Sequence, residues 1–409
     1  MTDTAAPASE DRVLVINSGS SSLKFQLLDP QDGTVEAAGL IERVGQGKGN
    51  ARIVAGEKRS TFEGPVPDHV AAMRIVERLF DDVGMSLADD RIRAVGHRVV
   101  QGGARYSQPV LIDSQVRWDI YDLGKLAPLH NYAAVEGIDG ARQQLPEVPH
   151  VAVFDTAFFT ALPAYSANYA LNREFAERHR VRRYGAHGTS HQFVSESVAE
   201  HLAAQGRDVS DLRQIVLHLG NGASASAVRA GVPVDTSMGL TPLEGLVMGT
   251  RTGDIDPSIY IHLHRQAGLS AEEVDAVLNK RSGMQGMCGM SDFRDITAAV
   301  DAGDEAATLA MEVYVHRLRK YVGSYAFALG GLDTIAFTAG IGENAGKVRR
   351  LALQDLTEFG IELDEAANET RAEGIHVIST PESAVTVLVV PTNEELAIAQ
   401  QAARVARCA

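Results

Sequence analysis

The sequence has only two cysteines in 409 residues, Cys288 and Cys408, and they lie far apart along the chain. This number excludes both a disulfide framework and a cysteine-rich metal site, and it is typical of proteins in a reducing compartment. No apolar run reaches the ~18 residues of a membrane-spanning helix. The segment from Met1 to Asp11 lacks the basic flank and apolar core of a signal peptide. We therefore expect a cytoplasmic protein without membrane contact.

Basic residues are also in deficit, with 38 Lys and Arg against 53 Asp and Glu and a formal net charge of −15. Nucleic-acid backbones are bound by clustered cations, so we expect no nucleic-acid partner. A small nucleotide stays compatible with this charge. A few local arginines, backbone N–H groups and a magnesium ion are enough to hold its phosphates.

Apolar and small residues are abundant: 45% of the chain is hydrophobic, and it has 38 Gly but only 14 Pro. This composition is typical of a globular protein, and the length exceeds what one core usually supports, so we predict two domains. The predicted strands span 13–16, 151–154, 215–219, 334–337 and 385–390. The predicted helices span 70–80, 192–204, 308–329 and 394–405. This order of elements indicates an α/β fold.

Two segments of the chain echo each other. VLVINSGSSSLKFQLL (13–28) and IVLHLGNGASASAV (215–228) each consist of an apolar strand, a turn with Asn, Gly and Ser, and a second strand. Two domains built alike would produce this echo. Two unrelated hairpins would do so as well, because these residues favour any turn. We place the domain boundary near Leu162-Pro163-Ala164, where a proline-containing stretch follows the strand that ends at Asp155.

Both turns are candidate phosphate sites, because backbone N–H groups and hydroxyls can wrap a phosphate. The first turn runs from Asn17 to Ser22 and is followed by Lys24, and the second runs from His218 to Ser224. Gly220 and Gly222 would let a phosphate approach the backbone closely. Neither turn is a Walker A loop, and a merely polar hairpin is the alternative for each.

A third glycine-bearing turn, from Phe337 to Ala345, resembles the G-x-G-x-x-A pattern of dinucleotide-binding folds. It lies near residue 340 of 409, which leaves too little chain for the rest of such a sheet. An adenosine site and a plain tight turn are the other interpretations.

Two regions offer carboxylates for a metal ion or for catalysis. Asp155 ends a predicted strand, where α/β sheets usually carry functional groups, although it could equally cap a helix. Thr392 and Glu395 have the spacing of a capping box, which leaves Glu394 as the better magnesium candidate.

His187 and His191 lie four residues apart, as in some zinc sites, but the Glu of H-E-x-x-H is absent and Gly188 disfavours a helix across the pair. A loop histidine directed at a phosphoryl group and a structural histidine are the alternatives. Arg98 and Arg251 suit carboxylates or phosphates, which guanidinium groups bind in bidentate fashion. For Arg251 the alternative is a salt bridge to Asp254 or Asp256, and for Arg98 it is a surface charge.

Taken together, these segments resemble the acetate kinase family, from Val13 nearly to the end of the chain. The matching segments are VLVINSGSSSLKFQLL, LAPLHN, VFDTAFF, RRYGAHGTSHQFV, HLGNGAS, MGLTPLEGLVMGTRTGDIDP, FTAGIGEN and PTNEEL, in the family's order. The resemblance implies two ribonuclease-H-like (actin-like ATPase) domains with a nucleotide in the cleft between them. These would be residues 1–162 and 163–392, with helix 393–409 packing back on the first. It also implies a homodimer formed largely through the second domain.

The resemblance further implies transfer of the γ-phosphoryl group of ATP to acetate, with magnesium as cofactor and manganese as a substitute. Asp155, His187 and Arg251 would be catalytic, and Asn17 and Glu394 would hold the metal ion. Acetate would contact Arg98, Val100, Leu129, Ala186 and Pro242. ATP would contact Ser20, Ser22, Lys24, His218, Leu219, Gly220, Asn221, Gly222, Asp292, Phe293, Arg294, Gly340, Ile341, Gly342, Glu343 and Asn344.

The chemistry agrees with direct in-line transfer, because acetate is ionised at neutral pH and needs no general base. Asp155 would then order magnesium or Arg251 instead of removing a proton. Three positions depart from the family's pattern, which has Phe, His and Pro where this chain has Ala186, Gln101 and Tyr132. They make a propionate or other short-chain acyl kinase the alternative. A more distant alternative, from another functional class, is an actin-like switch ATPase.

Overall fold

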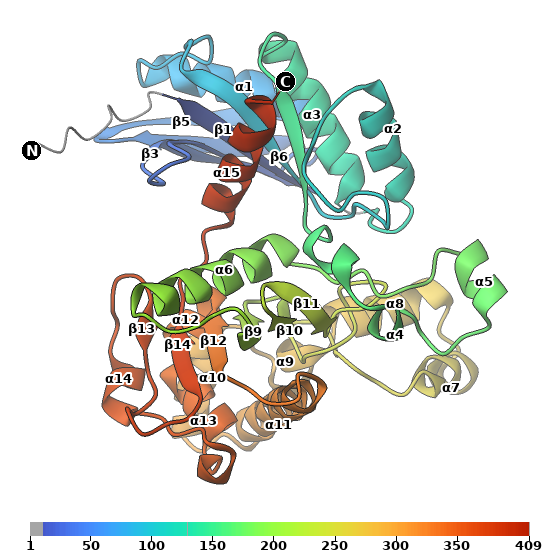
Figure 1. Cartoon of the computed structure of the whole chain (residues 1–409). Helices are drawn as coiled ribbons and strands as arrows, with labels where there is room; N and C mark the ends of the chain where they lie inside the picture. The colour runs from blue at the N-terminus through green and yellow to red at the C-terminus, as the bar shows by residue number, and fades with distance from the viewer. Residues whose placement is uncertain (1–10, 129, 409) are drawn as a thin grey trace, which may run out of the picture. The chain divides into compact units, whose positions relative to one another are not determined.

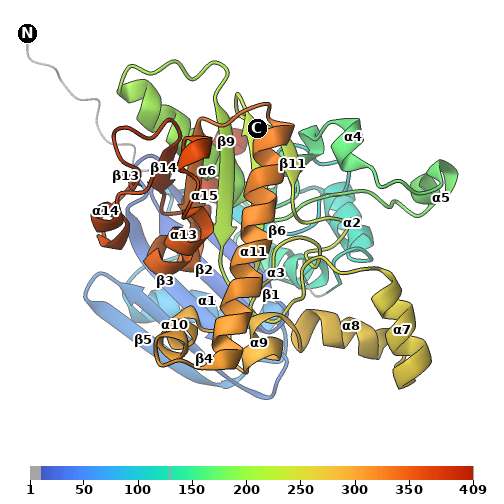
Figure 2. The ribbon, with the colours of Figure 1, turned by 90° about the horizontal axis from the view of Figure 1, so that it is seen from below.

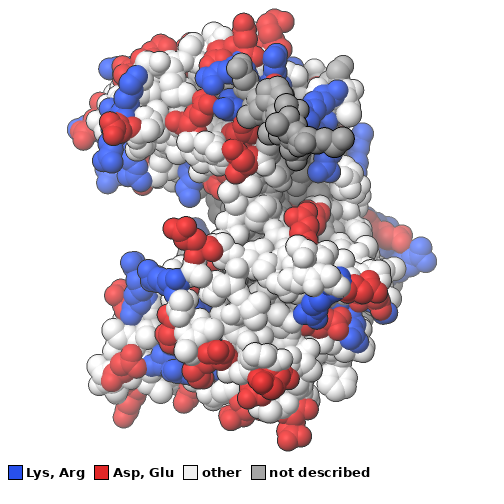
Figure 3. Space-filling model, turned by 60° about the vertical axis from the view of Figure 1, so that its left-hand side comes forward, with Lys and Arg blue, Asp and Glu red and all other residues white. Residues whose placement is uncertain are grey.

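The computed structural model describes residues 11–128 and 130–408, which form two compact units (Figure 1). The described part of unit 1 consists of residues 11–157 (apart from 129) and 393–408, and unit 2 consists of Phe158–Thr392. Within the described residues no helix is long and apolar enough to cross a membrane. Both signs of charge are interspersed on the face that Figure 3 presents.

Unit 1 is built on an eight-stranded sheet with the order β5-β4-β3-β2-β1-β6-β8-β7. β1 is parallel to β6 and β6 is parallel to β8, whereas the remaining neighbours are antiparallel. The strands are β1 (Arg12–Gly19), β2 (Ser22–Leu28), β3 (Val35–Glu42), β4 (Lys48–Ala55), β5 (Lys58–Pro65), β6 (Ile92–Val99), β7 (Val110–Leu111) and β8 (His150–Phe154). The helices are α1 (His69–Asp82), α2 (Ser114–Leu123), α3 (Asn131–Gln144) and α15 (Glu394–Ala406).

Helices cover both faces of this sheet. Leu14 and Ile16 of β1 belong to the core that includes residues of α1, whereas Val13 and Val15 pack with α15. A strand that is buried on both faces reads as a continuous apolar run, which explains the sequence of β1. Gly96 of β6 lets α15 approach closely, because a Cβ there would lie 2.8 Å from Ile398.

Unit 2 contains a six-stranded sheet with the order β11-β10-β9-β12-β14-β13. Its strands are β9 (Arg213–Leu219), β10 (Ala223–Arg229), β11 (Val232–Thr236), β12 (Thr334–Thr338), β13 (His376–Val377) and β14 (Thr386–Val389). Its helical segments are η1 (Phe158–Ala161), α4 (Ala164–Ala167), α5 (Arg173–Arg178), α6 (Gly188–Ala204), α7 (Ser258–Ala267), α8 (Ala271–Lys280), α9 (Gly283–Cys288), α10 (Phe293–Asp301), α11 (Glu305–Ala328), α12 (Ala339–Asn344), α13 (Gly346–Leu353), η2 (Thr357–Phe359) and α14 (Glu365–Glu369). The long α11 packs against β9 and β10 (Figure 2).

The internal echo has a structural counterpart. In unit 1 the hairpin β1–β2 continues into β3 on one side, and β6 and β8 lie parallel to β1 on the other. In unit 2 the hairpin β9–β10 continues into β11, and β12 and β14 lie in the same relation to β9. The two segments are therefore equivalent hairpins in two sheets of one plan. All strands and helices predicted from the sequence are present.

The division between the units lies at Ala157 and Phe158, slightly before the boundary that the sequence suggests. The reason is η1, which packs on β11 and α6 of unit 2. Its Phe159 is fully buried and its ring contacts that of His191 edge-on. The proline-containing stretch therefore lies inside unit 2. The second crossing, between Thr392 and Asn393, precedes α15, which packs on β6 and β8 of unit 1.

Candidate active site

In unit 1 the candidate residues gather at the carboxyl ends of the parallel strands. Asn17 is near the end of β1, Arg98 is in β6, and Asp155 directly follows β8. The register pairs Ile16 with His97 and Arg98 with Val153, so the three strands end side by side. This edge of an α/β sheet is where ligands usually bind.

Arg98 and Asp155 form a closely coupled ion pair. Nη2 and Nε of Arg98 donate to the two carboxylate oxygens of Asp155 at 2.6 and 3.2 Å, and Nη1 donates to Oδ1 of Asn17 at 3.4 Å. Burial opposes the charge of Arg98, but Asp155 and Glu394 raise its pKa above the usual value. Arg98 is thus no surface charge.

Glu394 is the first residue of α15, and Oε2 lies 3.8 Å from Nε of Arg98. The predicted capping box is wrong. The N-cap is Asn393, whose side chain accepts from the backbone N–H of Leu396. Thr392 instead shares a hydrogen bond with Ser190. Asn caps a helix as well as Thr does, so the helix begins one residue later than the motif suggests.

The oxygen atoms of Asn17, Asp155 and Glu394 offer the hard donors that Mg²⁺ prefers. Burial raises the pKa of Glu394 to about 7. The nearby Arg98 opposes this rise, and the Asp155 and Glu395 carboxylates add to it. A cation at this edge would favour the ionised form of Glu394, so these residues fit a magnesium ion.

The first glycine and serine turn connects β1 to β2. Asn17 and Lys24 are direct cross-strand partners in this hairpin. Ser20 and Lys24 are exposed and Ser22 is half-buried. His69 anchors the turn, since its Nε2 shares a hydrogen bond with the carbonyl of Gly19 at 2.8 Å. The hydroxyls and the cation are therefore open to a ligand.

Of the residues expected to surround the methyl group, Val100 is half-buried just after β6, and Leu129 lies outside the described residues. Gln101 braces its own loop, because its Oε1 accepts from the N–H of Gly103 at 2.8 Å. The ring of Tyr132 lies 5.1 Å from that of Tyr121 and fills the space beside Gly124. The substituted residues Gln101 and Tyr132 thus have packing roles within unit 1.

In unit 2 the second turn lies at the carboxyl end of β9, beside the end of β12. His218 of β9 is in register with Thr338 of β12. A Cβ on Gly220 would lie 3.9 Å from that of Ala339, so the turn is next to the start of α12. Leu219 is fully buried, which leaves its backbone as the part that can contact a ligand.

His187 precedes α6 in a left-handed conformation, with φ of 57°. Its ring stacks on that of His218, with centroids 4.4 Å apart. A Cβ on Gly222 would lie 3.4 Å from Nε2 of His187 and 3.6 Å from Nη1 of Arg251. A histidine and an arginine therefore converge where Gly222 has no side chain.

Arg251 lies in the loop between β11 and α7, and Nη1 donates to the carbonyl of Pro242 at 3.2 Å. Burial lowers the pKa of its guanidinium. No carboxylate in the described part of unit 2 lies within ion-pairing distance of it, and Asp254 pairs with Arg317 instead. The salt-bridge interpretation of Arg251 is therefore wrong, and the guanidinium is suited to an external anion.

His191 is not a zinc ligand partner of His187. It is fully buried in α6, and its two ring nitrogens share hydrogen bonds with the hydroxyls of Ser224 and Ser226 at 2.6 and 2.8 Å. As Gly188 suggests, no helix spans the pair, because α6 begins at Gly188 itself.

The remaining predicted nucleotide residues divide into available and buried ones. Asp292 is the N-cap of α10 and pairs with Arg294, whose side chain is exposed. Phe293 packs on Tyr314 in the core, so its ring is not offered to a ligand. Gly340 to Asn344 lie in α12, where a Cβ on Gly340 would meet open space, whereas Gly342 packs near Leu217 and Ile341 is partly buried.

Comparison with known proteins agrees with this arrangement. Residues 12–400 match the model of the acetokinase family. The chain belongs to this family. The acetate kinase of Leifsonia xyli subsp. xyli is 53% identical over 390 residues, which cover 95% of this chain and 98% of the relative.

Two solved structures have the same fold as this chain. The crystal structure of Porphyromonas gingivalis acetate kinase matches with a TM-score of 0.91 and 41% identity, covering 97% of this chain and 99% of that one. A propionate kinase from Francisella tularensis matches with a TM-score of 0.87 and 40% identity, covering 96% and 98%. The predicted α/β class with two actin-like ATPase domains is thereby confirmed.

Sequence reasoning missed two residues that shape the candidate site. Gly249 is one, because any side chain there would collide with Asn221 of the phosphate turn. Arg349 is another: it is buried and donates to the carbonyls of Gly342 and Glu343 at 2.8 and 2.9 Å, which completes the end of α12. Gly249 lies inside a matching segment, whereas nothing in the local pattern distinguishes Arg349 from a surface cation.

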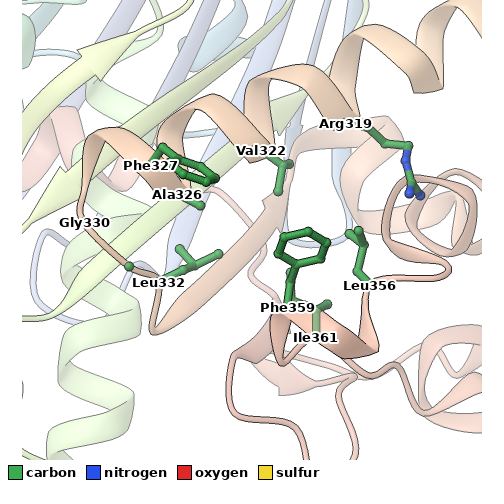
Figure 4. Close-up of a pocket in the computed structure, with 11 residues that line it drawn as sticks. Arg319, Val322, Ala326, Phe327, Gly330, Leu332, Leu356, Phe359 and Ile361 are labelled. Atoms are coloured by element: carbon green, nitrogen blue, oxygen red, sulfur yellow. The ribbon is translucent and has the colours of Figure 1, made fainter.

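An apolar groove of about 650 Å³ lies elsewhere in unit 2, along the second half of α11 (Figure 4). Phe327 and Leu332 lie at one end and Leu356 and Arg319 at the other. None of the residues predicted for the site of this acetokinase lines it. The candidate site is therefore defined by the strand ends and not by this groove.

Proposed function

We propose that the protein is an acetate kinase, which transfers the γ-phosphoryl group of ATP to acetate and works in both directions. The observation that carries the proposal is Arg251. It is a partly buried cation with no carboxylate partner in the described part of its unit, beside His187 and the Gly222 turn. Family membership over 12–400 supports the same reaction.

Acetate is ionised well below neutral pH, so its oxygen attacks without a general base. The task of the protein is positioning and neutralisation of the charge on the transferring group. Arg251 and the ring of His187 would stabilise this charge. We propose that the residues of both units act on one ATP molecule, with His218–Gly222, Asp292, Arg294 and Gly340–Asn344 binding the nucleotide.

Arg98 would bind the acetate carboxylate. Asp155 accepts from Nε and Nη2 of Arg98 and Asn17 accepts from Nη1, so the second hydrogens of Nη1 and Nη2 are the ones that would donate to acetate. Asp155 thereby fixes the direction of the guanidinium, and we assign it an orienting role instead of proton removal.

A magnesium ion, or manganese in its place, would be held by Asn17 and Glu394 and would supply positive charge to the phosphate oxygens. Ser20, Ser22 and Lys24 lie on the same hairpin as Asn17, where their hydroxyls and ammonium group suit the same phosphates. We also propose a cytoplasmic location, where ATP is available and the free thiols of Cys288 and Cys408 stay reduced.

Propionate is the second candidate substrate, and Ala186 is the observation that favours it. A small residue replaces the Phe of the family pattern, and Tyr132 is packed on Tyr121 and Gly124. One methylene in an apolar pocket is worth about 1–3 kcal/mol. We therefore expect propionate to be used within about tenfold of acetate.

The test is kcat/KM for a panel of short carboxylates, measured as ADP formation. A switch ATPase would form ADP at one rate whatever acid is added. Ala186→Val and Ala186→Phe should raise the preference for acetate step by step, with thermal melts to check folding, since Ala186 is buried in the core of unit 2. If native acetate preference exceeds a hundredfold and neither variant changes it, Ala186 does not set specificity.

We further propose a homodimer formed through unit 2. Its α7 has no buried residue although it carries Ile259 and Ile261, which are 39% and 44% exposed. Around α4 and α5, Tyr165 and Phe175 are 80% and 55% exposed. A second protomer packed on these helices would cover these apolar side chains.

A further inference from the structure

A chain of three side chains lies buried in unit 2. The hydroxyl of Ser190 is 2.8 Å from Nδ1 of His218 and 2.8 Å from the hydroxyl of Thr392. Ser190 is fully buried, and it lies in the first turn of α6. The start of α6 has no side-chain cap. The hydroxyl therefore contacts the histidine instead of serving its own helix.

Ser190 fixes the orientation of His218. With Nδ1 engaged, Nε2 is the nitrogen on the side of the phosphate turn, 3.8 Å from the position of a Cβ on Gly220. The face of the ring is stacked on His187 at an interplanar angle of 18°. One hydroxyl thus constrains a ring that supports the proposed catalytic histidine.

The hydroxyl also selects where the proton of a neutral His218 resides. If Ser190 donates to Nδ1, Nε2 carries the hydrogen and can donate to a phosphate oxygen. If Nδ1 donates to Ser190, a neutral ring presents a lone pair at Nε2, and phosphate oxygens are acceptors only. The partner of one imidazole nitrogen sets the role of the other.

We propose that Ser190 is a positioning residue for phosphoryl transfer: it accepts from Thr392, donates to Nδ1 of His218 and holds the proton at Nε2, toward ATP. This rests on the proposed function, in which the Gly220 turn binds ATP. Thr392 is in turn held by the Glu343 carboxylate, which accepts from its N–H at 3.2 Å. The network therefore joins α12 to the phosphate turn through one serine.

The kinetic test compares Ser190→Ala with Ser195→Ala. Ser195 is a matched control, because it is also buried in α6 and its hydroxyl accepts from the Gln214 side chain at 3.0 Å. We expect Ser190→Ala to lower kcat by about tenfold, the scale known for hydrogen-bond partners of metal-ligating histidines, with KM for acetate unchanged. Ser190→Thr keeps the hydroxyl and should therefore lower kcat less than Ser190→Ala does. Equal effects at both serines, or kcat within twofold for Ser190→Ala, would overturn the proposal.

The second readout is the imidazole ¹⁵N NMR spectrum of the native protein, assigned with His218→Gln. We expect His218 to carry its hydrogen at Nε2, and a hydrogen at Nδ1 overturns the proposal even if Ser190→Ala fails to fold. The spectrum needs no turnover. Failure of the proposed function would appear separately, as a native protein that makes no ADP in response to acetate.

Discussion

Arg251 is the residue whose removal should affect turnover most clearly. Arg251→Ala is expected to lower kcat by about 10²- to 10³-fold, the usual loss when one preorganised charge stabiliser is removed. Folding should be unaffected, because the described part of unit 2 gives this guanidinium no ion pair and only a bond to the Pro242 carbonyl and a contact with the Met248 sulfur.

Arg350→Ala is the control for this variant, since Arg350 is a half-exposed cation of the same unit that pairs at 3.9 Å with Glu365. Steady-state kinetics and thermal melts of both variants make the comparison. Near-normal turnover of Arg251→Ala, or loss of its fold, would remove Arg251 from the catalytic residues.

The start of α15 separates a metal role from a structural one. Glu394→Ala should raise the magnesium concentration needed for half-maximal activity. Asn393→Ala should cost about 0.5–2 kcal/mol of stability, because it removes the cap. Glu395→Ala should change neither. Magnesium titrations and denaturant melts on the three variants are the measurement, and a stability loss at Glu395 with none at Asn393 would restore the Thr392 capping box.

At the start of α15 the sequence predicts the helix but not the residue that caps it. The T-x-x-E pattern correctly marks the beginning of a helix, but two adjacent residues can cap equally well, and the choice depends on long-range contacts. Thr392 is engaged by Ser190, which is distant in sequence. The ion pair between Arg98 and Asp155 could likewise not be predicted, since it depends on the order of the strands in the sheet.

At the level of elements, β6 and β8 carry a pair of buried histidines. Nε2 of His97 and Nδ1 of His150 share a hydrogen bond of 2.9 Å, and the rings are stacked. Burial is the main cause that lowers the pKa of both, and the charge of Arg142 lowers it further, whereas the hydrogen bond to the Leu145 carbonyl raises the pKa of His150 in part. Both rings are therefore neutral in the folded protein at neutral pH.

This pair predicts a loss of stability in mild acid. Below pH ~6.5 these histidines bind protons in the unfolded chain but not in the folded chain. Their contribution to the free energy of unfolding is therefore fully present above that pH and is lost as the pH decreases. Each unit of pKa difference corresponds to about 1.4 kcal/mol.

Urea melts between pH 7.5 and 5 would measure this effect. His97→Gln should flatten the pH dependence, whereas the exposed His316→Gln should leave it as in the native protein. An unchanged pH dependence in His97→Gln would show that this pair does not control acid stability.

The elements themselves were largely predictable from the sequence. Strands such as β1 and β12 are buried on both faces, and their continuous apolar runs are unambiguous. The antiparallel strands β3 to β5 were not predicted, because they are half exposed and contain Gly, Glu and Lys. The boundary suggested by the sequence lies a few residues after the division at Phe158. The sequence could not show this, because the burial of Phe159 depends on α6 and β11, which come later in the chain.

For the whole molecule, the exposed apolar residues of unit 2 predict a dimer in solution. Ile261→Asp should shift the mass measured by light scattering from dimer toward monomer, because a charge in an apolar interface is left unpaired. Phe327→Asp is the control, since Phe327 is 84% exposed on α11 of the same unit. If Phe327→Asp dissociates the protein and Ile261→Asp does not, the interface lies at the groove of Figure 4.

The central claim is that the chain transfers a phosphoryl group directly from ATP to acetate. The most direct measurement is ³¹P NMR of the protein with ATP, magnesium and acetate, followed against the same sample without acetate. The account predicts that acetyl phosphate forms in step with ADP, and that ADP formation requires acetate. Release of inorganic phosphate at an equal rate in both samples, without acetyl phosphate, would contradict it.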